Sequence, residues 1–124
     1  MKLCLVVDDS GVVRKVARRI IEDLGVECEE AEDGQKAYEF CQKKIPDAIL
    51  LDWNMPVMDG IEFLQKLRQM DQGDVPKVIF CTTENDMSHI QTAMQAGANE
   101  YIMKPFDSGI LESKFIQIGI LSAS

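Results

Sequence analysis

The amino-acid sequence predicts an α/β protein in which five parallel strands form one sheet with helices on both faces. Short apolar runs alternate with segments whose apolar residues recur at helical spacing, a pattern typical of parallel sheets with right-handed crossovers. Five such pairs fit into 124 residues, which favours one domain spanning residues 1–124. For so few strands we expect a doubly wound, flavodoxin-like (βα)5 sandwich in the order 2-1-3-4-5.

The first half of the chain is expected to supply three strands and two helices. Two of the strand segments are unbroken apolar runs, and the middle one alternates as a strand nearer the sheet edge does. The predicted strands are 3–7, 26–31 and 48–51. Apolar residues at helical spacing predict a first helix over 12–24, stopped by Gly25, and a second around 37–41, which must end before Pro46.

The second half continues the same alternation. The predicted strands are 78–81 and 101–103. Helical spacing predicts three more helices, over 61–70, 87–96 and 109–121. The first of these is closed by the polar residues 71–74 and the second by Gly97, and either Asp107 or Ser108 can cap the third.

The composition limits the possible functions. A formal net charge of -8 and a pI of about 4.6 argue against nonspecific binding to nucleic acid or to an anionic membrane. The four cysteines lack C-x-x-C spacing and there is one histidine, so a zinc site is not expected. Free thiols inside apolar runs, the absence of a signal-peptide pattern and the absence of an apolar run of about 18 residues predict a cytoplasmic protein.

The stretch from Asp47 to Pro56 is the centre of the chain. Its apolar run ends on Asp52, and Pro56 cannot continue the strand because proline donates no hydrogen bond to a ladder. Asp52 should therefore lie at the carboxyl end of a central strand, the edge at which open α/β sheets bind ligands. Taken alone, Asp52 could also be an ordinary turn or cap carboxylate.

Other strand ends carry polar side chains at the same edge. Asp8 and Asp9 follow the first strand, Thr82 the fourth and Lys104 the fifth. The two acids could instead cap the first helix, Thr82 could be an ordinary strand-end hydroxyl, and Lys104 could be a solvated lysine. Capping explains their joint placement at separate strand ends poorly, so we expect them to converge with Asp52 in one shallow cleft.

Charge indicates what such a cleft would bind. Three carboxylates repel one another, and Lys104 supplies one positive charge, which leaves a deficit that a divalent cation cancels. An all-oxygen site favours a hard ion, and Mg²⁺ suits carboxylates together with water and a backbone carbonyl, which Asn54 could offer. Mg²⁺ and Lys104 together would accept a phosphoryl group, with Asp52 as the nucleophile and Thr82 donating its hydroxyl to a phosphoryl oxygen.

With these residues the chain resembles response-regulator receiver domains, and among them the single-domain chemotaxis regulators. The resemblance covers nearly the whole chain, and its motifs are very specific when they occur together. They are Val7-Asp8-Asp9-Ser10, residues 51–60 (LDWNMPVMDG), Thr82-Thr83-Glu84, Ala96-Gly97-Ala98 and residues 101–106 (YIMKPF). One departure is Ser10, where the chemotaxis regulators have an aromatic residue.

The resemblance implies a protein of a two-component system. Asp52 would be the phosphoacceptor, supplied by a sensor histidine kinase or a histidine phosphotransfer protein. Asp9, Asp52 and the Asn54 carbonyl would bind Mg²⁺ directly, and Asp8 would act mostly through water. The chain would not be an enzyme in the usual sense, because it would catalyse only its own phosphorylation and dephosphorylation.

The resemblance also implies a conformational switch. The Thr82 hydroxyl would move toward the phosphoryl group, and the Tyr101 ring would turn inward into the space it leaves. The peptide bond before Pro105 would be cis. Asn54 and Glu84 resemble a pair associated with quick self-dephosphorylation.

If residue 124 ends the chain, output must occur by protein contact, since no further domain follows. We expect the target to bind helix four, strand five and helix five, with the protein a monomer or weak dimer. Helix five has more apolar residues than one buried stripe needs, so some are expected to face a partner, unless the helix is frayed.

The basic residues of helix one could contact an acidic kinase surface, although a solvated helix face is the simpler interpretation. They are Arg14, Lys15, Arg18 and Arg19. Trp53 is expected to pack over its loop, and His89 to lie at the surface.

Three alternatives remain open from the sequence. A Mg²⁺-dependent phosphatase of the haloacid-dehalogenase type would need Asp-x-Asp after the first strand, whereas Asp8 and Asp9 are adjacent. A flavin binder would need a phosphate loop without two acids that repel phosphate. A phosphotransfer intermediate in a relay cannot be distinguished by sequence from a regulator that binds a motor or another effector.

Overall fold

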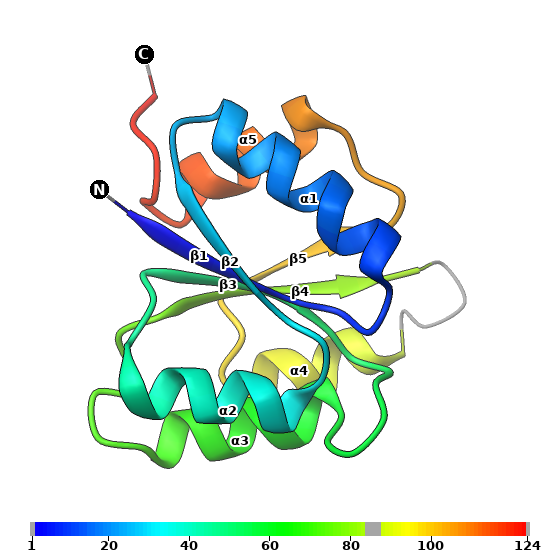
Figure 1. Cartoon of the computed structure of the whole chain (residues 1–124), viewed down its shortest axis with the longest axis vertical. Coiled ribbons are helices and arrows are strands. Elements are labelled where there is room, and N and C mark those ends of the chain that lie inside the picture. Colours follow the sequence, from blue (N-terminus) through cyan, green and yellow to red (C-terminus); the bar gives the residue numbers. More distant parts are fainter. Residues whose placement is uncertain (1, 84–87, 124) are drawn as a thin grey trace.

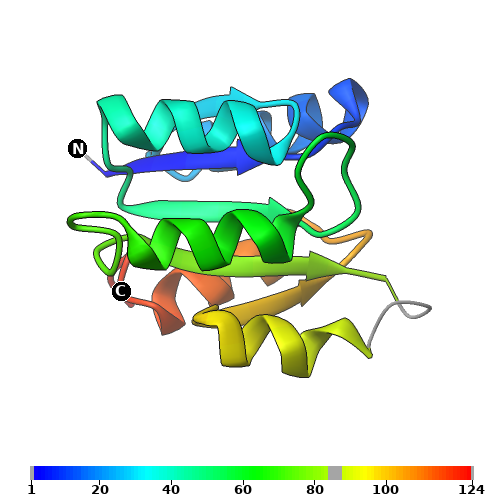
Figure 2. The ribbon, with the colours of Figure 1, turned by 90° about the horizontal axis from the view of Figure 1, so that it is seen from below.

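The five predicted strands form one parallel sheet in the computed structural model, which describes residues 2–83 and 88–123. The strand order is β2-β1-β3-β4-β5, as predicted. The strands are β1 (Leu3–Val7), β2 (Glu27–Ala31), β3 (Ala48–Asp52), β4 (Lys77–Thr82) and β5 (Glu100–Met103). Because the strands are parallel, their carboxyl ends lie at the same edge of the sheet (Figure 2).

The helices cover both faces of the sheet (Figure 1). One face carries α1 (Gly11–Asp23) and α5 (Ser108–Gln117). The other face carries α2 (Gly34–Lys43), α3 (Gly60–Gln69) and α4 (His89–Ala96), which lie side by side in that order (Figure 2). The predicted start of the fourth helix at Met87 falls outside the described residues. Among the described helices, none is both long and apolar enough to cross a membrane.

The central strands are buried on both faces, and this explains why they are unbroken apolar runs in the sequence. In β3, Ile49 and Leu51 pack into the core beneath α2, α3 and α4, whereas Ala48 and Leu50 pack into the core beneath α1 and α5. The edge strand β2 instead exposes three of its five residues, in agreement with its alternating sequence.

Four helices begin with a side-chain cap at the carboxyl edge of the sheet or close to it. In each, an oxygen of the N-cap side chain accepts a hydrogen bond from the backbone N–H three residues later. The caps are Ser10 of α1, Asp33 of α2, Asp59 of α3 and Asp107 of α5. The alternative in which Asp8, Asp9 or Asp52 caps a helix is therefore wrong, because other residues occupy the N-cap positions.

The predicted end of the last helix at residue 121 was wrong. Helix α5 ends at Gln117, and Gly119 has φ +83°. The N–H groups of Ile120 and Gly119 donate to the carbonyls of Phe115 and Ile116, which is a Schellman motif. The motif returns Ile120 to the core, where it is 8% exposed. Most of the apolar surplus that suggested a partner-facing stripe is thus used inside the molecule, and Ile110 is the large apolar side chain that remains exposed in the described part of this segment.

Candidate functional site

Three carboxylates converge at the carboxyl edge of the sheet. Strands β1 and β3 are neighbours with Val7 opposite Leu51, so the next residues, Asp8 and Asp52, lie side by side where these strands end. One carboxylate oxygen from each of Asp8, Asp9 and Asp52 lies within 4.8 Å of the others. Asp8 and Asp52 are 4% and 8% exposed, whereas Asp9 is exposed to solvent.

Lys104 reaches these carboxylates from the end of β5. Its Nζ lies 2.9 Å from Asp8 Oδ2 and 3.1 Å from Asp52 Oδ1. The backbone N–H of Lys104 donates to the Thr82 carbonyl at 2.7 Å, which fixes the start of this loop on β4. The peptide bond between Lys104 and Pro105 is cis, as the sequence resemblance implied. The solvated-lysine alternative is therefore wrong.

Burial and charge act in opposite directions on the two paired groups. Burial raises the pKa of Asp52, the charge of Lys104 lowers it, and Asp8 raises it further, with a net upward shift. Burial lowers the pKa of Lys104, but its hydrogen bond to Asp8 and the charge of Asp52 outweigh this, so its pKa is raised. Lys104 thus remains charged, yet it compensates only part of the repulsion among three acids.

Ser10 and Arg14 hold Asp8 in place, and sequence reasoning missed both roles. The Ser10 N–H donates to Asp8 Oδ1 at 2.9 Å, while the Ser10 hydroxyl accepts from Val13 N–H and caps α1. Arg14 donates to the Asp8 carbonyl at 2.7 Å and also to Glu30 Oε1 at 3.0 Å. A serine just before a helical pattern predicts an N-cap, so the role of Ser10 could have been found from the sequence. The contacts of Arg14 could not, because they depend on how α1 packs against β2.

The loop after β3 is held close to the phosphoacceptor candidate. The Gly60 N–H donates to the Trp53 carbonyl at 2.8 Å, and a Cβ at position 60 would collide with the Asp52 carbonyl. Glycine is therefore needed where α3 begins, because the chain returns directly onto the end of β3. Asn54 is an exposed residue of this loop, and its role as a carbonyl ligand stays a prediction.

The proposed switch residues lie on β4 and β5. Thr82 is 1% exposed, and its hydroxyl donates to the Thr83 carbonyl at 3.2 Å. Tyr101 is half-buried, with Lys114 Nζ 5.0 Å from its ring centroid. Thr82 stands at the edge that carries the acids, whereas Tyr101 lies further back along β5. Their coupling stays a prediction, and Glu84 lies outside the described residues.

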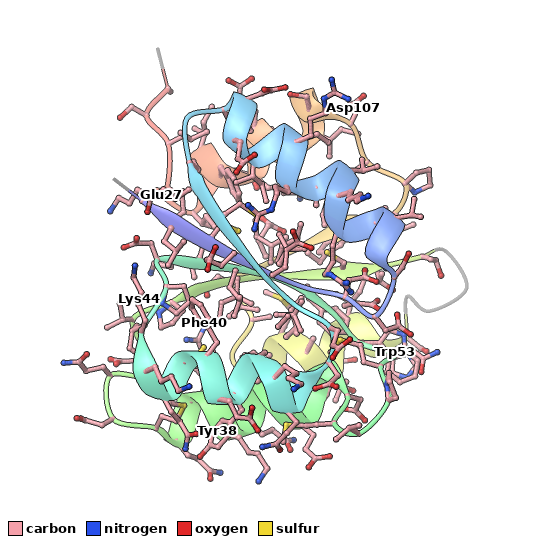
Figure 3. The ribbon with its side chains drawn as sticks, in the orientation of Figure 1. Glu27, Tyr38, Phe40, Lys44, Trp53 and Asp107 are labelled. Carbon is pink, nitrogen blue, oxygen red and sulfur yellow. The ribbon has the colours of Figure 1, made fainter. Side chains whose placement is uncertain are left out.

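The sequence led us to expect His89 at the surface, and the structure differs. It is half-buried at the start of α4, and its ring stacks on Trp53 with centroids 3.8 Å apart and planes 20° from parallel. Trp53 extends from the β3–α3 loop at the carboxyl edge of the sheet (Figure 3). Nothing in the sequence indicates this pairing, because the two residues are 36 positions apart and meet only through the strand order.

The basic residues of α1 divide into two groups. Arg14 pairs with Glu30, and Arg18 pairs with Glu30, Glu29 and Glu22. The pairs with Glu29 and Glu30 attach α1 to the edge strand β2, whereas the Arg18–Glu22 pair lies within α1. Lys15 and Arg19 are exposed, so they are the two basic side chains of this set that face solvent.

The donor set fits a hard divalent cation. It offers carboxylate oxygens from three residues, close enough to share one ion, and three carboxylates with one ammonium leave a formal charge of about -2. Two of the acids are buried, so this excess charge is poorly screened by water. Burial is the main cause of the raised pKa of Asp52, and a small cation at this edge would relieve the repulsion from Asp8 and Asp9 that adds to it.

Comparison with known proteins gives consistent similarities. The response regulator receiver domain family matches residues 4–115. The chemotaxis protein CheY1 of Helicobacter pylori is 39% identical over 116 residues, which cover 92% of this chain and 93% of the relative. The chemotaxis protein CheY homolog of Campylobacter jejuni is also 39% identical over 116 residues, covering 92% of this chain and 88% of the relative.

Solved structures show the same likeness. The chemotaxis protein CheY4 of Vibrio cholerae has a TM-score of 0.89 at 34% identity and covers 95% of this chain and 98% of its own. The receiver domain of the sensor histidine kinase PA1611 of Pseudomonas aeruginosa has a TM-score of 0.86 at 29% identity, with the same coverage, and that structure has a magnesium ion coordinated in its active-site cleft.

Proposed function

This chain belongs to the response regulator receiver domain family and acts in two-component signalling, and from this premise we propose that Asp52 is its phosphoacceptor. The observation that carries the proposal is the position of the Asp52 carboxylate. It is buried at the end of β3, lies 3.1 Å from Lys104 Nζ, and shares a 4.8 Å cluster with Asp8 and Asp9.

The reaction is a transfer of one phosphoryl group from nitrogen to oxygen. An Asp52 carboxylate oxygen attacks phosphorus, the bond from phosphorus to the donor imidazole breaks, and an acyl phosphate forms. Lys104 would pair with the negative charge on the phosphoryl oxygens. Its ammonium already lies within hydrogen-bonding distance of Asp52 Oδ1 and is therefore close to any group that Asp52 carries. We expect catalysis to be limited to this step and to hydrolysis of the acyl phosphate, in which water takes the phosphoryl group, inorganic phosphate leaves and the Asp52 carboxylate is regenerated.

The cation of the site is proposed to be Mg²⁺. Asp9, Asp52 and the Asn54 carbonyl would hold it, with Asp8 acting mostly through water. When bound, Mg²⁺ supplies neutralisation of charge on the phosphoryl oxygens. The three-carboxylate donor set supports this assignment, and so does the magnesium ion in the PA1611 receiver domain.

Phosphorylation is proposed to change the protein through Thr82 and Tyr101. A phosphoryl group brings about one additional negative charge and three strong acceptor oxygens to the cleft. The Thr82 hydroxyl, which now donates to the Thr83 carbonyl, would donate to one of them instead. Tyr101 would then turn inward and alter the α4–β5–α5 face, to which a downstream target binds.

The phosphodonor is proposed to dock over α1 and the β5–α5 loop. An apolar groove of about 350 Å³ lies there, directly beside the cleft. Its lining includes Val12, Val13, Val16, Lys104, Pro105 and Phe106. Val12 and Val16 are 74% and 53% exposed, and Lys15 and Arg19 on the same helix suit an acidic partner. A sensor histidine kinase or histidine phosphotransfer protein seated there would present its phosphohistidine to Asp52.

The chemotaxis proteins among the relatives support chemotaxis-type signalling over a relay intermediate or a haloacid-dehalogenase-type phosphatase. Output would occur by protein contact, from a monomer or weak dimer. The four buried free thiols suit the reducing environment of the cytoplasm.

Intact mass after incubation with acetyl phosphate and Mg²⁺ tests the proposal. We expect one labile phosphoryl group on the wild type, none on Asp52→Asn and none in the presence of a chelator. Lys104→Ala should be phosphorylated poorly. Asp107→Asn makes the same charge change at a cap outside the cluster and should behave as the wild type. A stable phosphoryl adduct on Asp52→Asn would contradict the assignment.

A further inference from the structure

Helix α4 is attached to the rest of the molecule by different contacts at its two ends. At its C-terminal end, Arg68 of α3 donates from Nε and Nη2 to the Gly97 carbonyl at 3.1 and 2.8 Å. The same guanidinium donates to the carbonyls of Gly73 and Pro76 and to Asn99 Oδ1. Five hydrogen bonds from one half-buried side chain fix this end of the helix to α3 and to the start of β4.

The N-terminal end of α4 is attached in a different way. Its N-cap, Ser88, makes no side-chain capping hydrogen bond. Within the described helix, Ala93 is the buried residue, and Gln91 and Thr92 are exposed. The stack of His89 on Trp53 is therefore a main side-chain contact between this end and the β3–α3 loop.

Trp53 connects this contact to the phosphoacceptor. It directly follows Asp52, and its carbonyl is fixed by the Gly60 N–H at 2.8 Å. Its indole Nε1 is buried and has no hydrogen-bond partner, so among the described residues the ring is held by packing and by the stack on His89. The position of the indole ring is thus not fixed by a hydrogen bond, whereas the backbone of Trp53 is held by the Gly60 N–H.

We propose that the Trp53–His89 stack is a releasable latch that ties the N-terminal end of α4 to the state of Asp52, while Arg68 holds the other end as a pivot. The inference rests on the proposed phosphorylation of Asp52. Added charge and volume at Asp52 displace the indole, the stack loosens, and the N-terminal part of α4 becomes free to move. His89 acts through Trp53 and is a positioning residue.

The latch is tested first without phosphodonor, by hydrogen exchange of peptides covering residues 88–97 and by acrylamide quenching of the single tryptophan. His89→Ala should speed exchange by about 2- to 10-fold, the range expected for loss of an aromatic pair, and should raise the quenching constant because one ring face is uncovered. His89→Phe keeps a stacking ring and should restore both values. Gln91→Ala, an exposed change on the same helix, should leave both at wild-type values. Equal exchange in His89→Ala and wild type would overturn the latch, and so would failure of His89→Phe to restore it.

The coupling is tested on the same proteins with acetyl phosphate and Mg²⁺, with phosphorylation followed by intact mass. Phosphorylated wild type should exchange faster over residues 88–97, and phosphorylated His89→Ala should show no further increase. If that variant is phosphorylated and its α4 still responds as in the wild type, the latch is overturned and the proposed function stands. If the wild type gains no phosphoryl group, the proposed function fails, and the latch fails with it.

Discussion

Asp52 has a side chain that is costly to keep charged in the resting protein. Burial raises its pKa, and Lys104 at 3.1 Å only partly opposes this because Asp8 and Asp9 add like charge. A bound cation that neutralises the Asp52 carboxylate is therefore favoured, because it removes the free-energy cost of a buried charge among like charges. The repulsion among the three carboxylates favours binding of a cation, and this links the local electrostatics to the chemistry proposed for the site.

Val57 lies five residues after Asp52, in the loop between β3 and α3, and has an unfavourable backbone conformation. Its φ is +69°, a region that β-branched residues rarely adopt, and Met58 N–H donates to the Pro56 carbonyl across it at 2.7 Å. The side chain is 80% exposed, so it contributes little packing that could offset the strain. The loop thus carries backbone strain close to the proposed phosphoacceptor.

Replacing Val57 by glycine is expected to stabilise the protein. Relief of roughly 1–3 kcal/mol of strain exceeds the entropy cost of about 0.5–1 kcal/mol for a new glycine, so the free energy of unfolding should rise by about 1 kcal/mol. Urea unfolding measures the change. Val75→Gly is the matched control, because Val75 is also an exposed loop valine but lacks a positive φ. The control should be destabilised, and a similar loss in Val57→Gly would show that the loop is not strained.

Individual side chains differed in how well the sequence predicted them. Asp8, Asp52 and Lys104 were predictable because they follow strands, and parallel strands deliver their ends to one edge. The partners of Arg14 and His89 were not, because they depend on how a helix rotates against its neighbours. Local patterns define which face of a helix is apolar, but they do not define which aromatic ring meets another.

At the scale of elements, Arg68 connects three parts of the fold around the C-terminal end of α4. Its five hydrogen bonds reach acceptors in the α3–β4 loop, at the end of α4 and before β5. Burial lowers the pKa of Arg68, with Asp74 opposing, so the guanidinium is held at some cost in solvation. Gly97 has φ +117°, and a Cβ there would press on the Arg68 side chain, which explains glycine at this helix end.

Arg68→Met is expected to lower the free energy of unfolding by roughly 2–4 kcal/mol, because it removes charge-assisted hydrogen bonds and leaves several carbonyl groups without a donor. Urea unfolding at constant pH measures the loss. Arg19→Met, the same change at an exposed position of α1, should alter stability by less than about 0.5 kcal/mol. Equal effects of the two substitutions would remove the structural role assigned to Arg68.

The elements themselves were largely predictable, and the failures have physical causes. Strands β1 to β5 match the predicted segments to within a residue because burial on one or both faces leaves a clear pattern. Helix α5 was predicted too long because Ile118, Ile120 and Leu121 continue its apolar composition beyond Gln117. The single sign of its end was Gly119, and the Schellman motif that uses it also returns apolar residues to the core.

For the whole molecule, the distribution of charge matters more than its sum. The chain carries a formal net charge of -8, and part of this excess is concentrated in the three acids at the carboxyl edge. Most other acids are exposed or paired, as in the ion pairs between α1 and β2. A divalent cation should therefore stabilise the folded protein mainly through one site and not by general screening.

Mg²⁺ is accordingly expected to raise the melting temperature at constant ionic strength. At a concentration ten times its Kd, a ligand that binds only the folded state adds about 1.4 kcal/mol, which for a domain of this size corresponds to a rise of roughly 3–6 °C. Asp9→Asn should lose most of the response, since it removes an exposed carboxylate of the cluster without disturbing the core. Asp107→Asn changes the charge equally and keeps its capping ability, so it should respond as the wild type does. Thermal melts with MgCl₂ or with NaCl of matched ionic strength measure both. Equal responses of the two variants would mean that Mg²⁺ acts by screening the whole surface, and the cluster would then not be its site.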